Sequence, residues 1–229
     1  IADACVSAGC ALLGGETAEH PGLMEPDEYD IAGATTGVVE ADELLGPDRV
    51  QPGDVALAMA SSGLHSNGYS LVRHVLLDEG GLSLDATISQ LGRTLGEELL
   101  EPTHVYAGQV MKLLDRVSVH AMSHITGGGL AANLVRVVPQ GMRVDVDRAT
   151  WRPAGIFELV QATGDISQAD IEATLNMGVG MVALLPPDQV DAAQRVLDEL
   201  GLNSWACGQV SATPGQPATV ELSGSHPLS

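Results

Sequence analysis

Apolar and polar positions along the 229-residue chain follow two different periods, which predict an α+β or α/β protein. Short apolar runs bounded by turn residues predict buried strands at 10–13, 31–39, 55–60, 121–125, 144–146, 179–185 and 205–210. Apolar residues spaced three and four positions apart predict helices at 1–10, 69–78, 102–114, 130–138, 153–163, 168–175 and 187–200.

Breaker residues divide the chain into two predicted parts. The stretch 46–54 holds two prolines and two glycines, which predicts a boundary between a part at 1–49 and a domain at 50–229. A loop is predicted at 21–28, a surface excursion at 80–98 and a frayed tail from about 211. The first helix has no cap before it, so we expect the chain to begin within a larger element.

Composition and charge exclude some partners. The 10 basic and 30 acidic residues give a net charge of −20, which repels nucleic acid and anionic membranes. No apolar run reaches the roughly 18 residues of a membrane span. Three cysteines, an odd number without metal-ligand spacing, favour a reducing compartment, so we expect a cytoplasmic protein.

The first candidate site is the sequence GGETAEHPG at 14–22, directly after a predicted strand. Gly14 and Gly15 allow the backbone to approach a ligand closely, and Thr17 belongs to the same segment. Glu16 is a carboxylate at a strand end, which suits Mg²⁺ beside phosphate oxygens. A hairpin turn with a solvated glutamate fits the same spacing.

The second candidate site is a polar loop at 61–68, between a buried strand and a helix, which is the geometry of an anion site. Its uncharged binding candidates are Ser61, Ser62, Gly63, Ser66 and Asn67. His65 suits contact with a phosphoryl oxygen or proton transfer near neutral pH. In the alternative interpretation, Ser66 or Asn67 caps the helix and His65 only packs.

The third candidate site is formed by Thr126, Gly127, Gly128 and Gly129, which precede a predicted helix. Several backbone N–H groups can point at one anion there, and three glycines in a row are costly in entropy, so we favour a ligand over a simple tight corner. Lys112 is the only lysine and no Walker-type sequence occurs. Phosphate binding would therefore depend on amides, hydroxyls, Mg²⁺ and a few arginines.

Other positions are assigned structural roles. Asn176 stands at a glycine-rich helix-to-strand corner, NMGVGM at 176–181, where we favour a structural function. His120 and His124 share a strand face without a third ligand, which argues against zinc. Neither a nucleophile elbow nor a Rossmann fingerprint is present.

Together these motifs resemble the phosphoribosylformylglycinamidine cyclo-ligase family, also called aminoimidazole ribonucleotide synthetases. The segments that carry the resemblance keep the same order over nearly the whole chain. They are GGETAEHPG at 14–22, YDIAG at 29–33, SSGLHSNGYSLVR at 61–73, HITGGG at 124–129, Phe157 and NMGVGM at 176–181.

The resemblance implies a two-domain aminoimidazole ribonucleotide synthetase-like fold and a homodimer joined through its N-terminal domains. It also implies that ATP and Mg²⁺ drive ring closure of formylglycinamidine ribonucleotide in purine synthesis, through an iminophosphate, with release of ADP and phosphate. Glu16 would hold Mg²⁺, His65 and Asn67 would contact the reacting amide or a phosphate, and residues 127–129 would bind a phosphate through backbone amides.

Two departures from the family pattern stand out. The family has an upstream Asp-Gly-Val-Gly-Thr-Lys segment at its ATP and metal site, which is not matched here, so we expect an incomplete N-terminal domain. His104 occupies a position where the family usually has arginine. The alternatives are an inactive fragment or dimerisation module of that enzyme, or an ATP-using relative such as selenophosphate synthetase, thiamine-monophosphate kinase or the amidotransferase of the same fold.

Overall fold

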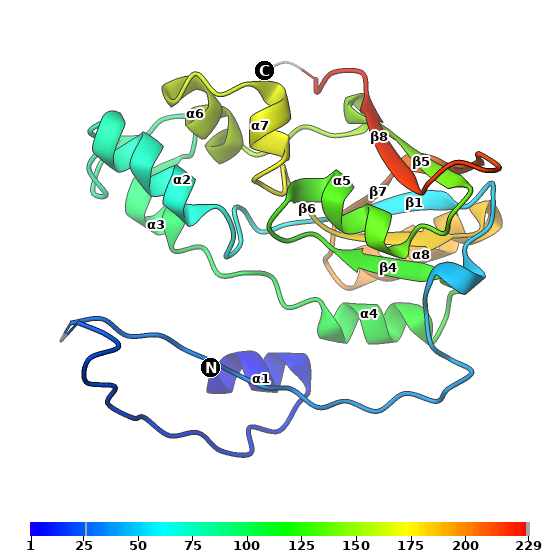
Figure 1. Ribbon diagram of the computed structural model, residues 1–229, viewed down its shortest axis with the longest axis horizontal. Coiled ribbons are helices and arrows are strands. Elements are labelled where there is room, and N and C mark those ends of the chain that lie inside the picture. The colour runs from blue at the N-terminus through cyan, green and yellow to red at the C-terminus, as the bar shows by residue number, and fades with distance from the viewer. Residues whose placement is uncertain (26, 228–229) are drawn as a thin grey trace. The chain divides into compact units, whose positions relative to one another are not determined.

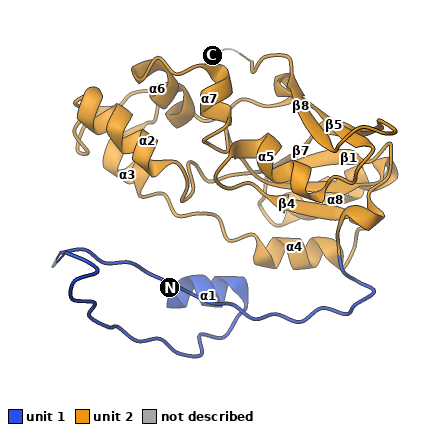
Figure 2. Ribbon diagram, viewed as in Figure 1, with its two compact units in different colours: residues 1–44 blue, residues 45–229 orange. Residues whose placement is uncertain are grey.

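The structure is a computed structural model that describes residues 1–25 and 27–227. The chain forms two compact units, residues 1–44 and 45–229 (Figure 2), which we call unit 1 and unit 2. Pro26, within the predicted loop 21–28, lies outside the described residues, as do the last two residues of the predicted tail. Among the described residues, no helix is long and apolar enough to cross a membrane.

Unit 1 contains α1 (Ala2–Ala8), which ends at Gly9, and then a chain that is largely without regular secondary structure. The strands predicted at 10–13 and 31–39 do not form in the described residues, so those two predictions are wrong for this structure. A strand is stable only when its N–H and C=O groups pair with a neighbour, and the described part of unit 1 offers none. The apolar side chains of both segments are consequently exposed, with Leu13 at 96% and Val38 at 103%.

Unit 2 is built on one mixed sheet in the order β4-β6-β1-β7-β5-β8 (Figure 1). Its strands are β1 (Val55–Ala60), β4 (Ala121–His124), β5 (Met142–Asp147), β6 (Val179–Leu185), β7 (Ser204–Ala212) and β8 (Thr219–Ser223). Neighbouring strands are antiparallel except β5 and β8, which are parallel. The mixed α/β class predicted from the sequence is confirmed.

The helices of unit 2 follow the predicted apolar stripes, with shifted ends, except α3, which lies largely within the predicted surface excursion. They are α2 (Tyr69–Arg73), α3 (Leu95–Leu99), α4 (Ala107–Leu114), α5 (Gly129–Leu134), α6 (Gly155–Thr163), α7 (Gln168–Glu172) and α8 (Val190–Glu199). A π-helix, His74–Glu79, continues α2, and short 3₁₀ turns occur at Pro47–Arg49, Val135–Val137, Arg148–Thr150 and Pro187–Gln189. A separate hairpin pairs β2 (Thr87–Ile88) with β3 (Arg93–Thr94).

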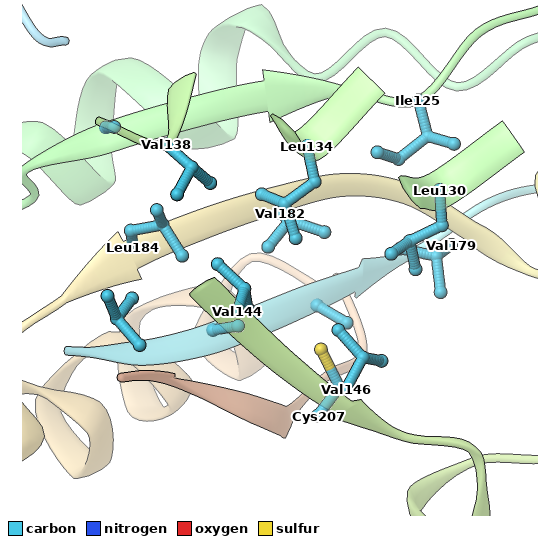
Figure 3. Close-up of a cluster of buried hydrophobic side chains, with 14 of the residues drawn as sticks. Ile125, Leu130, Leu134, Val138, Val144, Val146, Val179, Val182, Leu184 and Cys207 are labelled. Carbon is cyan, nitrogen blue, oxygen red and sulfur yellow. The ribbon is translucent and has the colours of Figure 1, made fainter. Parts of the chain in front are cut away.

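Side chains of β1 and β6 alternate between two apolar layers, because successive residues of a strand point to opposite faces. On one face, Ala56 and Ala58 join a cluster that α5 covers (Figure 3). On the other face, Leu57 and Met59 pack with α4 and α8. Burial on both faces explains why these strands appear in the sequence as unbroken apolar runs. A third cluster, around Phe157, joins α2, α6 and α7.

Residues 80–98 are more integrated than the predicted surface excursion. Thr94 caps α3 in a capping box with Glu97, and Leu95 is fully buried. Arg93 pairs with the buried carboxylate of Glu98 at 2.6 Å and with that of Glu101 at 2.6 Å. The excursion is therefore tied into the third cluster by a buried leucine and a network of charges.

The predicted frayed tail is also wrong. Strand β7 continues to Ala212, and β8 then returns to pair with β5. The Pro/Gly/Ser-rich residues between them form a connection, and Val220 and Leu222 of β8 pack against the core. The Arg148 guanidinium donates to the carbonyl oxygen of Leu222 at 2.8 Å, which fastens the end of this edge strand.

Candidate functional site

Two of the three predicted motifs lie together in unit 2. We call residues 61–68 the serine loop and residues 126–129 the glycine loop; they follow β1 and β4. A Cβ atom built on Gly127 would lie 3.6 Å from Oδ1 of Asn67, so the two loops are in contact. Segments that are about 60 residues apart in sequence thus form one polar surface at one end of the sheet.

Asn176 holds the shape of the serine loop. Its amide nitrogen donates to the carbonyl oxygens of Gly63, at 2.9 Å, and Leu64, at 3.1 Å. Its amide oxygen accepts from the Ser61 hydroxyl at 3.1 Å and from the Gly178 N–H at 2.8 Å. Asn176 is buried, and the structural role predicted for it is confirmed. Through these bonds Asn176 also fixes the backbone geometry of the serine loop, which is a candidate binding site.

Two of the three serine hydroxyls, those of Ser62 and Ser66, contact the segment before α4. The Ser62 hydroxyl donates to the carbonyl oxygen of Pro102 at 2.7 Å, so its proton is used within the fold. The Ser66 and Thr103 hydroxyls lie 2.9 Å apart. These bonds accompany an extended segment where the sequence predicted the first turn of a helix, which instead begins at Ala107. Helix α2 is capped by Gly68 without a side chain, so the capping interpretation of Ser66 and Asn67 is wrong.

His65 is a buried histidine whose ring accepts a backbone hydrogen bond and keeps one nitrogen unpartnered among the described residues. Its φ of 59° is in the left-handed region, which is rare for a residue with a side chain and is found at strained functional positions. The Ser62 N–H donates to Nε2 at 3.1 Å, so Nε2 is the acceptor and the neutral ring carries its proton on Nδ1. Nδ1 is buried and has no partner among the described residues. Burial, followed by the nearby His124 and His104 rings, lowers the pKa of His65 to about 4.

This lowered pKa predicts a loss of stability in mild acid. The unfolded chain binds a proton on His65 near its ordinary pKa of about 6.5, whereas the folded chain resists protonation until about pH 4. The free energy of unfolding therefore falls as pH decreases through this window, by about 2 kcal/mol between about pH 7.5 and pH 5. Urea titrations should show a flatter profile for His65→Gln than for the wild type. The exposed-site control His74→Gln should keep the wild-type slope, and equal slopes for all three would contradict the prediction.

Tyr106 is at the centre of a cluster of histidine rings. Its ring centroid lies 6.1 Å from that of His65, 4.6 Å from His104 and 6.2 Å from His124. The Tyr106 hydroxyl donates to the carbonyl oxygen of Ala60 at 2.7 Å, and burial raises its pKa, so it remains protonated. Burial also lowers the pKa of His104. Through His65, the cluster packs against the serine loop.

Asn133 closes the glycine loop from inside α5. Its amide nitrogen donates to the carbonyl oxygens of Thr126 and Gly127, both at 3.2 Å, and of Gly129 at 2.7 Å. Its amide oxygen accepts from the Thr126 hydroxyl at 3.0 Å. With its carbonyl groups held inward, the loop can direct its amide N–H groups outward. Within the described residues, no hydrogen bond uses the N–H of Gly127 or Gly128.

Two of the three glycines have a reason in the fold itself. Gly128 and Gly129 have φ values of 96° and 70°, which favour glycine. A Cβ atom on Gly129 would lie 1.7 Å from the carbonyl oxygen of Glu172, so this glycine also permits close packing on α7. Gly127 has neither a positive φ nor a close backbone neighbour. The tight-corner interpretation therefore explains Gly128 and Gly129, and Gly127 remains the position that a ligand explains best.

The first motif belongs to unit 1. Gly14, Gly15, Glu16 and Thr17 lie on an exposed segment without regular secondary structure, and a Cβ atom on either glycine would contact nothing within 4 Å. Among the described residues, the exposed Glu16 carboxylate has no hydrogen-bond or ion-pair partner, and proteins commonly hold Mg²⁺ with such a carboxylate and phosphate oxygens. Among the described residues, no group of three or more His, Cys, Asp or Glu side chains is arranged to hold a metal ion.

His120 and His124, predicted to share one face of a strand, have different partners in the structure. His120, which precedes that strand, is hydrogen-bonded to the buried side chain of Asp54, with Nδ1 2.7 Å from Oδ2. His124 belongs instead to the cluster around Tyr106. The two imidazoles thus contact different residues and do not face a common site.

A cavity of about 360 Å³ borders the serine loop. Its lining includes Ser62 and Gly63 from that loop, Arg152 before α6, and the indole rings of Trp151 and Trp205. The Trp205 indole N–H is buried without a hydrogen-bond partner among the described residues. The cavity therefore combines aromatic surface with donor groups, and nothing in the local sequence pattern predicted it.

Comparisons with known proteins agree with this architecture. Residues 51–221 match the family model described as AIR synthase related protein, C-terminal domain. The chain belongs to the AIR synthase related family. The chain is 47% identical to the phosphoribosylformylglycinamidine cyclo-ligase of Symbiobacterium thermophilum over 224 residues. The match covers 96% of this AIR synthase related chain and 64% of that protein. The enzyme of the same name from Shouchella clausii is 46% identical, with 94% and 62% covered. The chain thus spans a little under two thirds of these relatives.

Solved structures show that the AIR synthase related fold is shared more widely. Thiamine-monophosphate kinase from Stenotrophomonas maltophilia superposes with a TM-score of 0.54 at 22% identity, covering 80% of this chain and 54% of that one. E. coli HypE, a hydrogenase maturation protein, superposes with a TM-score of 0.52 at 18% identity, covering 79% and 49%. At such identities the likeness concerns the fold alone.

Several residues that shape the site of this AIR synthase related chain are not apparent in its sequence motifs. Tyr106 stands in a segment that appeared helical, and Asn133 appeared to be an ordinary helix position. Gly180 lies inside β6, where a Cβ atom would come within 1.8 Å of the Tyr106 hydroxyl. A glycine inside an apolar strand is a recognised sign of close approach by a neighbour, and it was the one available signal.

Proposed function

We propose that this chain supplies the C-terminal domain and part of the preceding domain of an ATP-dependent cyclo-ligase. The enzyme would close the imidazole ring of aminoimidazole ribonucleotide from formylglycinamidine ribonucleotide, releasing ADP and phosphate. The observation that carries the proposal is the contact between the serine loop and the glycine loop, which gathers uncharged donors at one place. The names of the relatives at 46–47% identity support the same reaction.

The proposed chemistry is a phosphoryl transfer followed by ring closure. The formyl amide oxygen of the substrate attacks the γ-phosphorus of ATP, and ADP leaves, which gives an iminophosphate. The amidine nitrogen then attacks the activated carbon, a C–N bond forms, and phosphate leaves with the former amide oxygen. Such reactions depend chiefly on positioning and on stabilising charge, for which fixed N–H donors are well suited.

In unit 2, the neutral Nδ1–H of His65 would donate to the amide or phosphoryl oxygen on which negative charge develops, and Asn67 would orient the same group. The N–H groups of Gly127 and Gly128 would bind a phosphate, whereas the Gly129 N–H, expected from the sequence to join them, donates to the carbonyl oxygen of Thr126 at 3.2 Å. Because Nε2 of His65 already accepts a backbone hydrogen bond, its proposed role is that of a donor and not a base. The serine loop, with Ser62, Gly63 and Ser66, would form the wall around the phosphates.

In unit 1, Gly14, Gly15 and Thr17 would approach the nucleotide, and Glu16 would hold Mg²⁺, which when bound neutralises charge on the phosphates. We also propose a homodimer formed through the N-terminal domain. The large exposed apolar side chains of unit 1 support further burial of that surface. They are Ile1, Val6, Leu12, Leu13, Leu23, Tyr29, Ile31, Val38, Val39 and Leu44.

Glu16→Ala tests the proposed function directly. In the complete polypeptide that contains this chain, we expect substrate-dependent ADP release to fall at least about 100-fold, because the cation loses its protein ligand. The fold should persist, since Glu16 is exposed. The matched control is Glu40→Ala, which removes another exposed carboxylate of unit 1 and should keep full turnover. Unchanged turnover in Glu16→Ala would overturn the metal role, and wild-type protein without turnover would overturn the cyclo-ligase assignment.

A further inference from the structure

The end of α1 brings two cysteines together. Gly9 is in the left-handed conformation with φ 70°, its N–H donates to the carbonyl oxygen of Val6, and the Cys10 N–H donates to that of Cys5 at 3.0 Å. This pair of bonds is a Schellman motif. In this kind of helix ending, the side chains at the two positions occupied here by Cys5 and Cys10 commonly contact each other. An apolar pair usually occupies them, whereas here both positions are cysteines.

The helix ending places the two cysteine side chains next to each other. The backbone bonds of the Schellman motif bring Cys5 and Cys10 to the same side of the helix end. Cys10 is exposed and Cys5 is half-buried, and neither is part of a disulfide. Cys207, by contrast, is buried inside the sheet, and burial raises its pKa to about 12, which makes it unreactive. The three cysteines are thus an adjacent pair in unit 1 and one residue in the core of unit 2.

We propose that Cys5 and Cys10 form a reversible thiol-modification site, which closes to an intramolecular disulfide by exchange with a small-molecule disulfide such as glutathione disulfide. The exposed Cys10 thiolate attacks one sulfur of glutathione disulfide, which breaks its S–S bond and releases one glutathione. Cys5 then loses its proton and attacks Sγ of Cys10 in the mixed disulfide, and the second glutathione leaves. Two protein thiols are oxidised and one glutathione disulfide is reduced to two glutathiones.

The order of the two attacks follows from the surroundings of each thiol. Desolvation and the neighbouring Cys10 raise the pKa of Cys5, so Cys5 remains a thiol until a mixed disulfide is held beside it. Because the helix ending fixes the two residues next to each other, the second attack is intramolecular and should outpace attack by free glutathione. The product closes a ring across the Schellman motif, four residues before Gly14.

The experiment is equilibration of the full chain with glutathione disulfide, alkylation of remaining thiols, and mass analysis of the tryptic peptide that ends at Arg49. Arg49 is the first basic residue, so this peptide carries Cys5 and Cys10 without Cys207. We expect the form that has lost two hydrogens to exceed the glutathione adduct by about tenfold or more. A dominant glutathione adduct on Cys10, or two alkylated thiols, would overturn the proposal.

Three variants test the geometric basis. Cys5→Ser should trap the glutathione adduct on Cys10, whereas Cys207→Ser should leave the ratio of disulfide to adduct unchanged. Gly9→Val keeps both cysteines but disfavours the left-handed conformation, so this ratio should fall severalfold. Denaturation in urea should lower the ratio in the wild type in the same way. If neither Gly9→Val nor urea lowers the ratio, the proposed role of the helix ending is wrong.

Discussion

Replacing Gly129 by alanine is expected to destabilise unit 2 by about 4 kcal/mol. Its new methyl group would meet the carbonyl oxygen of Glu172 at 1.7 Å, and φ at this position is 70°. The cost combines left-handed strain, about 1–2 kcal/mol, with displacement of packed backbone. Neither α5 nor α7 can yield easily, because both lie on apolar clusters. The change should appear as a lower urea midpoint in circular dichroism.

Gly201→Ala is the matched control for this result. Gly201 has the same φ of 70°, yet a Cβ atom there would contact nothing within 4 Å. Its substitution should therefore cost only the left-handed strain, about 1 kcal/mol. The difference between the two midpoints measures the close approach itself. Equal losses would show that the packing of the glycine loop on α7 contributes little.

Replacing Asn176 by alanine should cost about 3 kcal/mol and disorganise the serine loop. The substitution leaves the buried carbonyl group of Leu64 without its side-chain donor, leaves that of Gly63 with the Ser61 hydroxyl alone, and removes the partner of the Gly178 N–H. Asn176→Asp should be similarly damaging, because a carboxylate would face those same carbonyl oxygens. Thermal or urea unfolding gives the loss, and hydrogen exchange localises it to residues 61–64.

Asn67→Ala separates fold from function in the same region. No hydrogen bond of the Asn67 side chain is present among the described residues, so the variant should unfold within about 0.5 kcal/mol of the wild type. If the proposed role of Asn67 holds, turnover by the complete enzyme should nevertheless fall. Wild-type stability in Asn176→Ala would contradict the account of the loop, whereas full activity in Asn67→Ala would contradict the proposed site.

For strands buried on both faces, the first and last residues could be predicted from the sequence. Val55–Ala60 and Val179–Leu185 appear as unbroken apolar runs because helices cover both sides of the sheet. Strand β5 was predicted only at 144–146, since Arg143 and Asp147 at its ends resemble loop residues. Strand β8 was missed because its pairing with β5 depends on a distant partner. The strands of unit 1 failed for the opposite reason, because their apolar pattern has no partner among the described residues.

In the candidate site, too, features set by neighbouring residues could be predicted, whereas contacts between residues distant in sequence could not. The serine and glycine loops could be found because glycine and hydroxyl residues after a strand form a local pattern. Asn176 could be placed at a corner, but its bond to Gly63 spans 113 positions, which no local pattern reveals. The hydrogen bond that determines the His65 tautomer depends on a left-handed backbone at a residue with a side chain, which propensity does not predict.

The scarcity of aromatic residues gives the cavity beside the serine loop a practical property. The chain contains two tryptophans, and both line that cavity. Their ring centroids are 6.2 Å apart, so the indoles share one environment. The tryptophan emission of this chain, excited selectively over its three tyrosines, therefore originates at the cavity and needs no attached dye to be site-specific. A ligand or a loop movement at Ser62 and Gly63 would alter the colour and intensity of that emission directly.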